Sequence, residues 1–113
     1  EGQCDGGVAQ GLAYALMEET FLKDGRVVND NFSVYSIPTS KDMPEVEIIP
    51  VEVLEASGPY GAKGAAENAT IPTAPAILDA IADAIDVRFT AMPVTPEKVI
   101  STLADKTTLL DIK

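Results

Sequence analysis

The chain has 113 residues, with 18 acidic and 8 basic side chains and a formal net charge of −10. Its length favours a single domain, and its acidity argues against nucleic acid or an anionic membrane as a partner, because both bind basic patches. No stretch approaches the ~20 apolar residues of a membrane span and no signal peptide is visible, so we expect a cytoplasmic location. One cysteine and no histidine exclude an internal disulfide and any Ser-His-Asp or Cys-His pair within the chain. They also argue against a zinc site, and we predict no metal ligand in this chain.

The first predicted element is a helix over residues 5–20, with Asp5 as its N-cap and apolar residues recurring on one face. Gly11 inside this helix costs roughly 1 kcal/mol against alanine, which is tolerated most easily where something must come close to the helix backbone. One interpretation is therefore a capped helix with two unfavourable glycines. The other is a helix N-terminus that holds an anion such as a phosphate, with Gln10 hydrogen-bonding the same ligand.

Short strands are expected after this helix. Asp24 and Gly25 lie between apolar residues and form a hairpin-turn signal. Residues 45–54 interleave valine and isoleucine with glutamate and predict a strand broken near Pro50. Residues 88–92 predict a further short strand.

Two more helices are expected towards the end of the chain. The first covers residues 74–85 and carries a buried stripe of isoleucines. The second starts with Thr95 as N-cap and Pro96 at the first helical position, and it ends near Lys106, before a tail over 107–113 with some strand character. The order of elements predicts an α+β (mixed α/β) unit of three helices with a small, mostly antiparallel sheet.

A glycine-rich loop over residues 56–66 ends at an acidic residue, Glu67. Three glycines and one proline within residues 58–64 let the backbone bend sharply and approach a ligand closely. Their spacing fits neither a phosphate-binding P-loop nor the dinucleotide fingerprint. Glu67 is thus either a carboxylate placed to act as a base, or a first-turn acid favoured by the helix dipole after a loop that only connects elements.

Five segments in a fixed order resemble one known family. They are Gly6 to Leu12 (GGVAQGL), Ile37 to Thr39 with Asp42 to Pro44, the loop Gly58 to Glu67, Ala74 to Ile77, and Arg88 with Pro93 to Val99. Together they resemble the C-terminal segment of the molybdopterin-binding subunit of the xanthine dehydrogenase family, which also includes aldehyde oxidoreductases, carbon monoxide dehydrogenases and nicotinate-type hydroxylases. The resemblance covers nearly the whole chain.

This resemblance implies an activity and a set of site residues. The implied activity is a molybdenum-dependent hydroxylation or dehydrogenation that oxidises a carbon of an aldehyde or an N-heterocycle, with water as the oxygen source. In that family a glutamate at the position of Glu67 is the catalytic base. Gln10 and Gly11 are implied to bind the molybdopterin cofactor, and Lys63 and Gly64 to flank the same site.

The family's subunit is several times longer than this chain, so the resemblance also implies partners. They are the remaining molybdopterin-binding segment, iron–sulfur and FAD domains or subunits, and a small-molecule substrate. We expect residues 1–113 to be the C-terminal portion of a molybdopterin-binding domain, as a fragment or as a small separate chain, inactive and without bound cofactor when isolated. Two alternatives stay open: an excised domain with no activity of its own, and an acidic interaction module that needs no cofactor.

Overall fold

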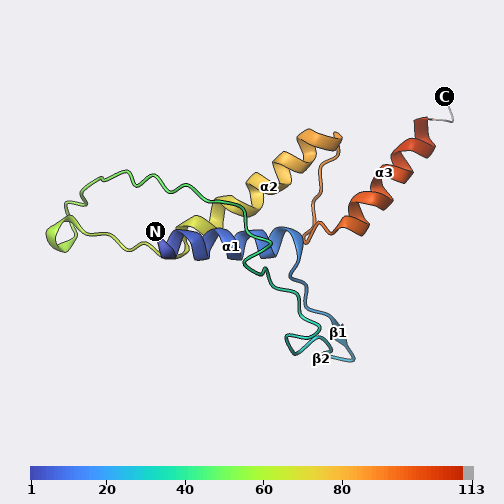
Figure 1. The fold of residues 1–113 in the computed structure, drawn as a ribbon, viewed down its shortest axis with the longest axis horizontal. Helices are drawn as coiled ribbons and strands as arrows, with labels where there is room; N and C mark the ends of the chain where they lie inside the picture. The colour runs from blue at the N-terminus through green and yellow to red at the C-terminus, as the bar shows by residue number, and fades with distance from the viewer. Residues whose placement is uncertain (111–113) are drawn as a thin grey trace.

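A computed structural model describes residues 1–110 of the chain. In chain order its elements are α1 (Gly2–Leu16), β1 (Leu22–Lys23), β2 (Arg26–Val27), η1 (Pro59–Gly61), η2 (Glu67–Ala69), α2 (Thr70–Ile85) and α3 (Pro96–Leu110), where η marks a 3-10 turn (Figure 1). Within the described residues these are three helices and one small antiparallel sheet. The predicted α+β class is therefore confirmed.

The contact of α1 with η2 and the start of α2 forms the centre of the molecule (Figure 1). Two glycines of α1 make it possible, because a Cβ atom at Gly7 would lie 2.8 Å from the Cβ of Ala69, and one at Gly11 would lie 2.5 Å from the Cβ of Thr73. Any side chain at these positions would push the two helices apart. The close approach expected at Gly11 is confirmed, and in this chain the approaching element is α2.

The buried apolar core is small and consists of Ala13, Ala15, Ala74 and Val94. No large side chain in the described part of the chain is fully buried, and the predicted isoleucine stripe of α2 is only half-buried. The radius of gyration is 18.6 Å, well above the roughly 13 Å of a compact domain of this length. Much apolar surface is therefore left uncovered by the chain itself.

The hairpin is an antiparallel pair in which Leu22 lies opposite Val27. Its two turn residues, Asp24 and Gly25, have φ values of 51° and 75°. A two-residue type I′ turn needs both central residues in this left-handed region. The predicted hairpin turn is confirmed.

The start of α3 also follows its prediction. Pro96 is the first helical residue, and the backbone N–H of Lys98 donates to the Thr95 hydroxyl oxygen at 3.4 Å, so Thr95 acts as N-cap. Just upstream, the Val94 N–H donates to the carbonyl oxygen of Ala15 at 2.7 Å. This bond ties the end of α1 to the segment that leads into α3, while α3 itself stands apart from the α1–α2 pair.

Four predicted helix boundaries are wrong. The first helix was predicted to run to residue 20, but α1 ends at Leu16. α1 begins at Gly2, so Asp5 lies in its first turn instead of at the N-cap, where its charge still suits the helix dipole. α2 begins at Thr70, earlier than predicted, because the η2 turn leads straight into it. α3 continues to Leu110, so most of the predicted tail is helical, and residues 111–113 lie outside the described residues.

Two predicted strands are also wrong, because neither 45–54 nor 88–92 has strand structure in the described chain. A strand needs a neighbour to satisfy its backbone N–H and C=O groups. The hairpin is the only pair of strands within residues 1–110, and it does not extend to either segment. Within the same residues, none of the helices combines the length and apolar character that a membrane span requires.

Candidate active site

Glu67 is the first residue of η2, which leads directly into α2. Its side chain is exposed. Among the described residues no hydrogen bond or ion pair holds its carboxylate, so the oxygens are accessible to a ligand. The position also lies at the N-terminal end of a helical run, where the partial positive charge of free N–H groups favours an anion. Both interpretations of Glu67, as an accessible base and as a helix-terminal acid, fit this geometry.

Gln10 lies on α1 with its side chain exposed. The hydroxyl of Thr70, the first residue of α2, donates a hydrogen bond to Gln10 Oε1 at 3.3 Å. Because this bond uses the amide oxygen, the Nε2 group keeps two N–H donors for another acceptor. Thr70 follows η2 directly, so the contact brings Gln10 to the helical turn next to Glu67.

Lys63 and Gly64 lie in the exposed loop that precedes η2. They line an open hollow of about 790 Å³ together with the extended stretch 48–54, the beginning of α1, and Asn68 of η2. A Cβ atom at Gly64 would meet no atom within 4 Å, so the backbone there faces open space. The loop and η2 thus share one hollow, whose lining includes neither Gln10 nor Glu67.

Gly11 is placed differently from the other predicted site residues. It is buried, and the space a side chain would need is filled by Thr73. Its lack of a Cβ atom therefore serves the packing of α1 on α2. A contact of its backbone with a cofactor stays a prediction.

The side-chain chemistry around η2 suits a polar cofactor that is held by hydrogen bonds. The amide of Gln10 offers N–H donors, Lys63 offers an ammonium group, and Glu67 offers a carboxylate that can accept a proton. Within residues 1–110 no group of three or more His, Cys, Asp or Glu side chains is arranged to hold a metal ion. The residues present thus fit the edge of an organic cofactor.

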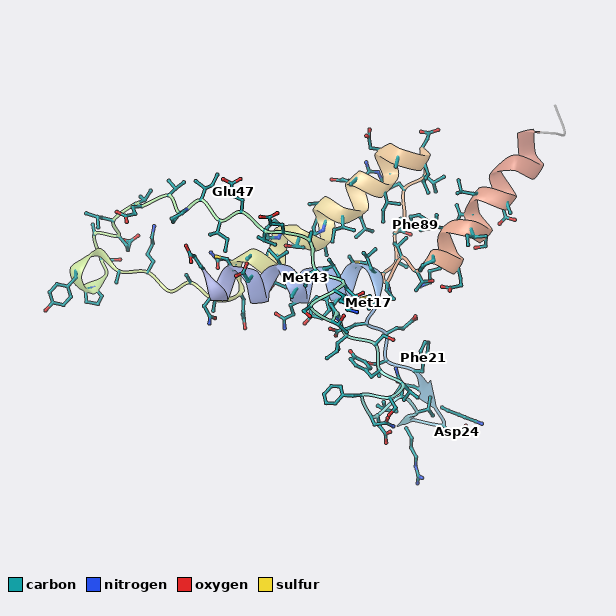
Figure 2. The ribbon with its side chains drawn as sticks, viewed as in Figure 1. Met17, Phe21, Asp24, Met43, Glu47 and Phe89 are labelled. Carbon is teal, nitrogen blue, oxygen red and sulfur yellow. The ribbon has the colours of Figure 1, made fainter. Side chains whose placement is uncertain are left out.

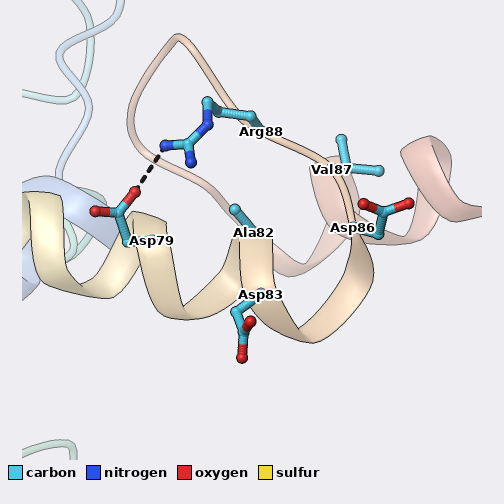
Figure 3. A pocket seen from close by; sticks show the side chains of 6 residues that line it. All are labelled: Asp79, Ala82, Asp83, Asp86, Val87 and Arg88. Atoms are coloured by element: carbon cyan, nitrogen blue, oxygen red, sulfur yellow. Dashed lines mark hydrogen bonds and ion pairs between the residues drawn. The ribbon is translucent and has the colours of Figure 1, made fainter.

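A second hollow, of about 590 Å³, lies near the other end of α2 and is lined by Asp79, Asp83, Asp86 and Arg88 (Figure 3). Arg88 Nη1 donates to Asp79 Oδ1 at 2.7 Å, with the two side chains 74% and 66% exposed. An ion pair this exposed contributes little to stability. The lining of this hollow includes none of the predicted site residues, so the candidate site is the region around η2.

The structure adds two residues to the site that the sequence did not indicate, Asn68 in the lining of the hollow and Thr70 on Gln10. Thr70 and Gln10 are 60 positions apart, and no local pattern relates residues at such a distance. For Asn68 and Thr70 the only available signal was the glycine-rich loop that precedes them.

Comparisons with known proteins agree with the resemblance that the ordered motifs indicated. Residues 1–44 match the family described as molybdopterin cofactor-binding domain. The chain is 39% identical over 101 residues to the xanthine dehydrogenase molybdenum-binding subunit of Escherichia coli O157:H7, covering 88% of this chain and 13% of that protein. It is 36% identical over 106 residues to the aldehyde oxidoreductase of Megalodesulfovibrio gigas, covering 91% of this chain and 11% of that protein.

A solved structure agrees with these sequence matches. The crystal structure of quinoline 2-oxidoreductase from Pseudomonas putida 86 superposes with a TM-score of 0.80 at 33% identity, over 88% of this chain and 13% of that one. The chain thus spans only a small part of the length of the relatives it matches. From the ordered motifs, these identities and this superposition, the chain belongs to the xanthine dehydrogenase and aldehyde oxidoreductase family of molybdenum-binding subunits.

Proposed function

We propose that this chain is part of a molybdenum-dependent hydroxylase or dehydrogenase, in which Glu67 is the catalytic base and Gln10 binds the molybdopterin cofactor. One observation carries the proposal. The hydrogen bond from Thr70 to Gln10 joins α1 to the helical run that starts at Glu67, so an amide donor and an accessible carboxylate lie on neighbouring turns. The membership of the family supports the identity of the cofactor.

The proposed reaction is the oxidation of an electron-poor carbon in an aldehyde or an N-heterocycle, with water as the oxygen source. The relatives support both substrate classes, since they are named for xanthine, aldehyde and quinoline. The bound cofactor would supply the redox chemistry by accepting the two electrons that leave the carbon. Glu67 would accept the proton of the attacking oxygen, which is the work of a general base.

The other predicted residues have supporting roles in this proposal. Lys63 and Gly64 would flank the site from the loop, where the open backbone at Gly64 permits close approach of a ligand. Gly11 would contact the cofactor through its backbone while it packs on α2. Residues 1–113 would form the C-terminal portion of the molybdopterin-binding domain and would need the rest of that subunit for activity.

Further groups complete the proposed enzyme. Iron–sulfur and FAD groups, on other domains or subunits, would carry the electrons away from the molybdenum centre. The relatives include subunits of larger complexes, such as the gamma subunit of the 6-hydroxypseudooxynicotine dehydrogenase complex of Paenarthrobacter nicotinovorans. A cytoplasmic location stays a prediction from the sequence.

The substitution Glu67→Gln in the assembled enzyme tests the role of the base. It keeps the size of the side chain and removes the proton acceptor, so we expect kcat to fall by about 100-fold or more while molybdenum content is unchanged. Glu97→Gln is the matched control, because Glu97 is also an exposed glutamate in the first turn of a helix but lies on α3. Full turnover by the Glu67→Gln enzyme would contradict the assignment.

Gln10→Leu tests the role in cofactor binding separately from the chemistry. Leucine is similar in size and has no N–H donors, so we expect a lower molybdenum content in the purified enzyme. Metal analysis gives this result without any assay of activity. A normal molybdenum content would contradict the role of Gln10.

A further inference from the structure

Residues 45–54 form an extended segment that joins the first half of the chain to the glycine-rich loop. In Figure 2, Glu47 lies on this segment where it runs out from the α1–α2 pair. The Glu55 N–H donates to the carbonyl oxygen of Gly61 at 3.1 Å, which closes the turn that follows. Among the described residues, no hydrogen bond joins the backbone of residues 45–54 to another group. Apart from Pro50, which has no N–H to donate, the backbone N–H and C=O groups of the segment are therefore free to form a ladder.

The side chains of the segment are those of a buried strand. Ile49, Val51 and Val53 are 74%, 81% and 62% exposed, and because they alternate they share one face of an extended chain. Ile48 and Leu54 belong to the opposite face. Valine and isoleucine favour strands, and apolar residues on both faces are typical of a strand covered on both sides. An uncovered edge of this kind pairs readily with other strands.

We infer that residues 45–54 become a β-strand by pairing with a strand in the larger part of the molybdenum-binding subunit. This inference rests on the proposed function, which names that larger part as the partner of the chain. The matched stretch spans 13% of the molybdenum-binding subunit of Escherichia coli O157:H7, so most of such a subunit lies outside it. The segment carries the propensity for a strand, and the partner supplies the neighbour that the described chain lacks.

Charge defines the partner strand further. Residues 45–55 contain four glutamates and no lysine or arginine. Like charges that face each other across a strand pair are destabilising, so pairing with a second copy would bring twice that number of glutamates together in a chain whose net charge is already −10. The segment therefore fits an apolar strand that carries lysine or arginine opposite its glutamates.

Hydrogen exchange of the amides 45–54 tests the pairing, measured in the free chain and in the assembled, molybdenum-loaded subunit. In the free chain we expect exchange close to that of an unstructured peptide, because no hydrogen bond protects these amides. In the assembled subunit we expect alternate amides to slow by roughly 100-fold or more, as in a paired strand. Light scattering of the same samples of free chain shows whether two copies of the chain pair with each other.

Two proline variants test whether the backbone N–H groups of the segment make the pairing. Val53→Pro and Leu54→Pro each remove one N–H, and because alternate N–H groups point to the same neighbour, at least one of the two removes a ladder bond. Each is compared with alanine at the same position, which shortens the side chain and keeps the N–H. We expect at least one proline variant to bind the rest of the subunit about 10-fold more weakly than its alanine control.

The outcomes separate this inference from the proposed function. An active, molybdenum-loaded assembly in which amides 45–54 exchange as fast as in the free chain overturns the pairing and leaves the proposed function intact. Proline variants that bind as well as their alanine controls also overturn it, as does a free chain that dimerises with these amides protected. Protected amides in an assembly whose Glu67→Gln variant keeps full turnover support the pairing and contradict the role of the base.

Discussion

The helical centre of the molecule and the long stretch from residue 20 to residue 66 are built in different ways. In the centre, α1 lies against η2 and α2, two elements that are distant from α1 in sequence. This contact is made by glycine and alanine residues. In residues 20–66 the hydrogen bonds are mostly local, and large apolar side chains such as Phe32, which is 84% exposed, have no cover. Figure 2 shows this stretch as a hairpin arm, with Phe21 and Asp24, and a separate open loop.

The contrast separates the part of the chain that is packed by its own residues from the part that needs other surfaces to cover it. The α1–α2 contact is complete, because close packing leaves no space at Gly7 or Gly11. The stretch 20–66 supplies strand-forming side chains and free backbone groups, which gain stability only when other surfaces cover them. Glu67 lies at the boundary between the two regions, at the end of the open stretch and the start of the packed one.

Gly11→Ala is expected to have the largest effect, and it acts on the packed region. The new Cβ atom would lie 2.5 Å from the Cβ of Thr73 and 3.1 Å from the carbonyl oxygen of Thr70. Both of these atoms are fixed to the backbone of α2, so the helices must separate. We expect the free energy of unfolding to fall by about 1–3 kcal/mol, measured by urea unfolding followed by circular dichroism.

Gly6→Ala is the matched control for this prediction. Gly6 lies on the same helix, and a Cβ atom there would meet nothing within 4 Å. Alanine should then raise the stability by up to about 1 kcal/mol, through helix propensity alone. Equal effects of the two substitutions would show that the contact between α1 and α2 does not control the stability of this region.

The sequence predicted the packed region better than the open one. Apolar periodicity indicated α1 and α2 because the period of a helix is visible within a few turns. The unfavourable Gly11 indicated a close approach, but the approaching residue, Thr73, lies far along the chain and carries no matching signal. For residues 45–54 the alternation of valine and isoleucine indicated a strand propensity, and the predicted strand is absent from the described chain. Strand structure depends on a neighbouring strand, and no local pattern shows whether one is present.

The candidate site likewise combines features that local sequence indicated with contacts that it did not. The glycine-rich loop and its order among the other motifs pointed to Glu67, because backbone flexibility followed by a fixed acid is a local feature. The hydrogen bond of Thr70 to Gln10 depends on how two helices cross, which the sequence does not display. The family resemblance supplied what spacing alone did not, namely the prediction that these separate segments belong to one site.

Asn29→Ala is expected to have a smaller effect, confined to the open region. Asn29 is the buried polar side chain of the hairpin arm, at 6% exposure. Its Oδ1 accepts the Phe21 N–H at 2.9 Å, and its Nδ2 donates to the carbonyl oxygen of Glu19 at 2.6 Å. Loss of this bridge should cost about 1–2 kcal/mol locally, seen as faster hydrogen exchange of the Phe21 amide.

Asn31→Ala is the control for the bridge, because Asn31 is exposed and its Oδ1 accepts only the nearby Ser33 N–H, at 3.0 Å. We expect it to leave the exchange of the Phe21 amide unchanged. Neither substitution should alter the global unfolding measured for the α1–α2 contact. If Asn29→Ala weakened that contact as much as Gly11→Ala, the two regions would form a single cooperative unit, and the contrast between them would be wrong.

The smallest expected effect concerns one turn of the open region and its dependence on pH. The hydroxyl and the backbone N–H of Thr39 both donate to Asp42 Oδ2 at 2.7 Å. These bonds favour the charged carboxylate and lower the pKa of Asp42 below its ordinary value of 3.8. The turn is therefore stabilised above pH 3.8, and this stability is lost as the pH falls through the lowered pKa.

An NMR titration of the Asp42 carboxyl measures this directly. Thr39→Val removes the hydroxyl and keeps the backbone N–H, so we expect the pKa of Asp42 to rise part of the way to its ordinary value, since the hydroxyl is the larger of the two causes. Ser40→Ala removes a neighbouring hydroxyl that is not among the hydrogen-bond partners of Asp42 and should leave the pKa of Asp42 unchanged. Because the carboxylate is exposed, solvent screens its charge, and the change should stay within the turn. An Asp42 pKa that does not move in Thr39→Val would assign the whole shift to the backbone N–H. Side-chain hydrogen bonds would then play no part in holding this turn, and the open region would depend on its backbone and on surfaces outside it even more than the structure indicates.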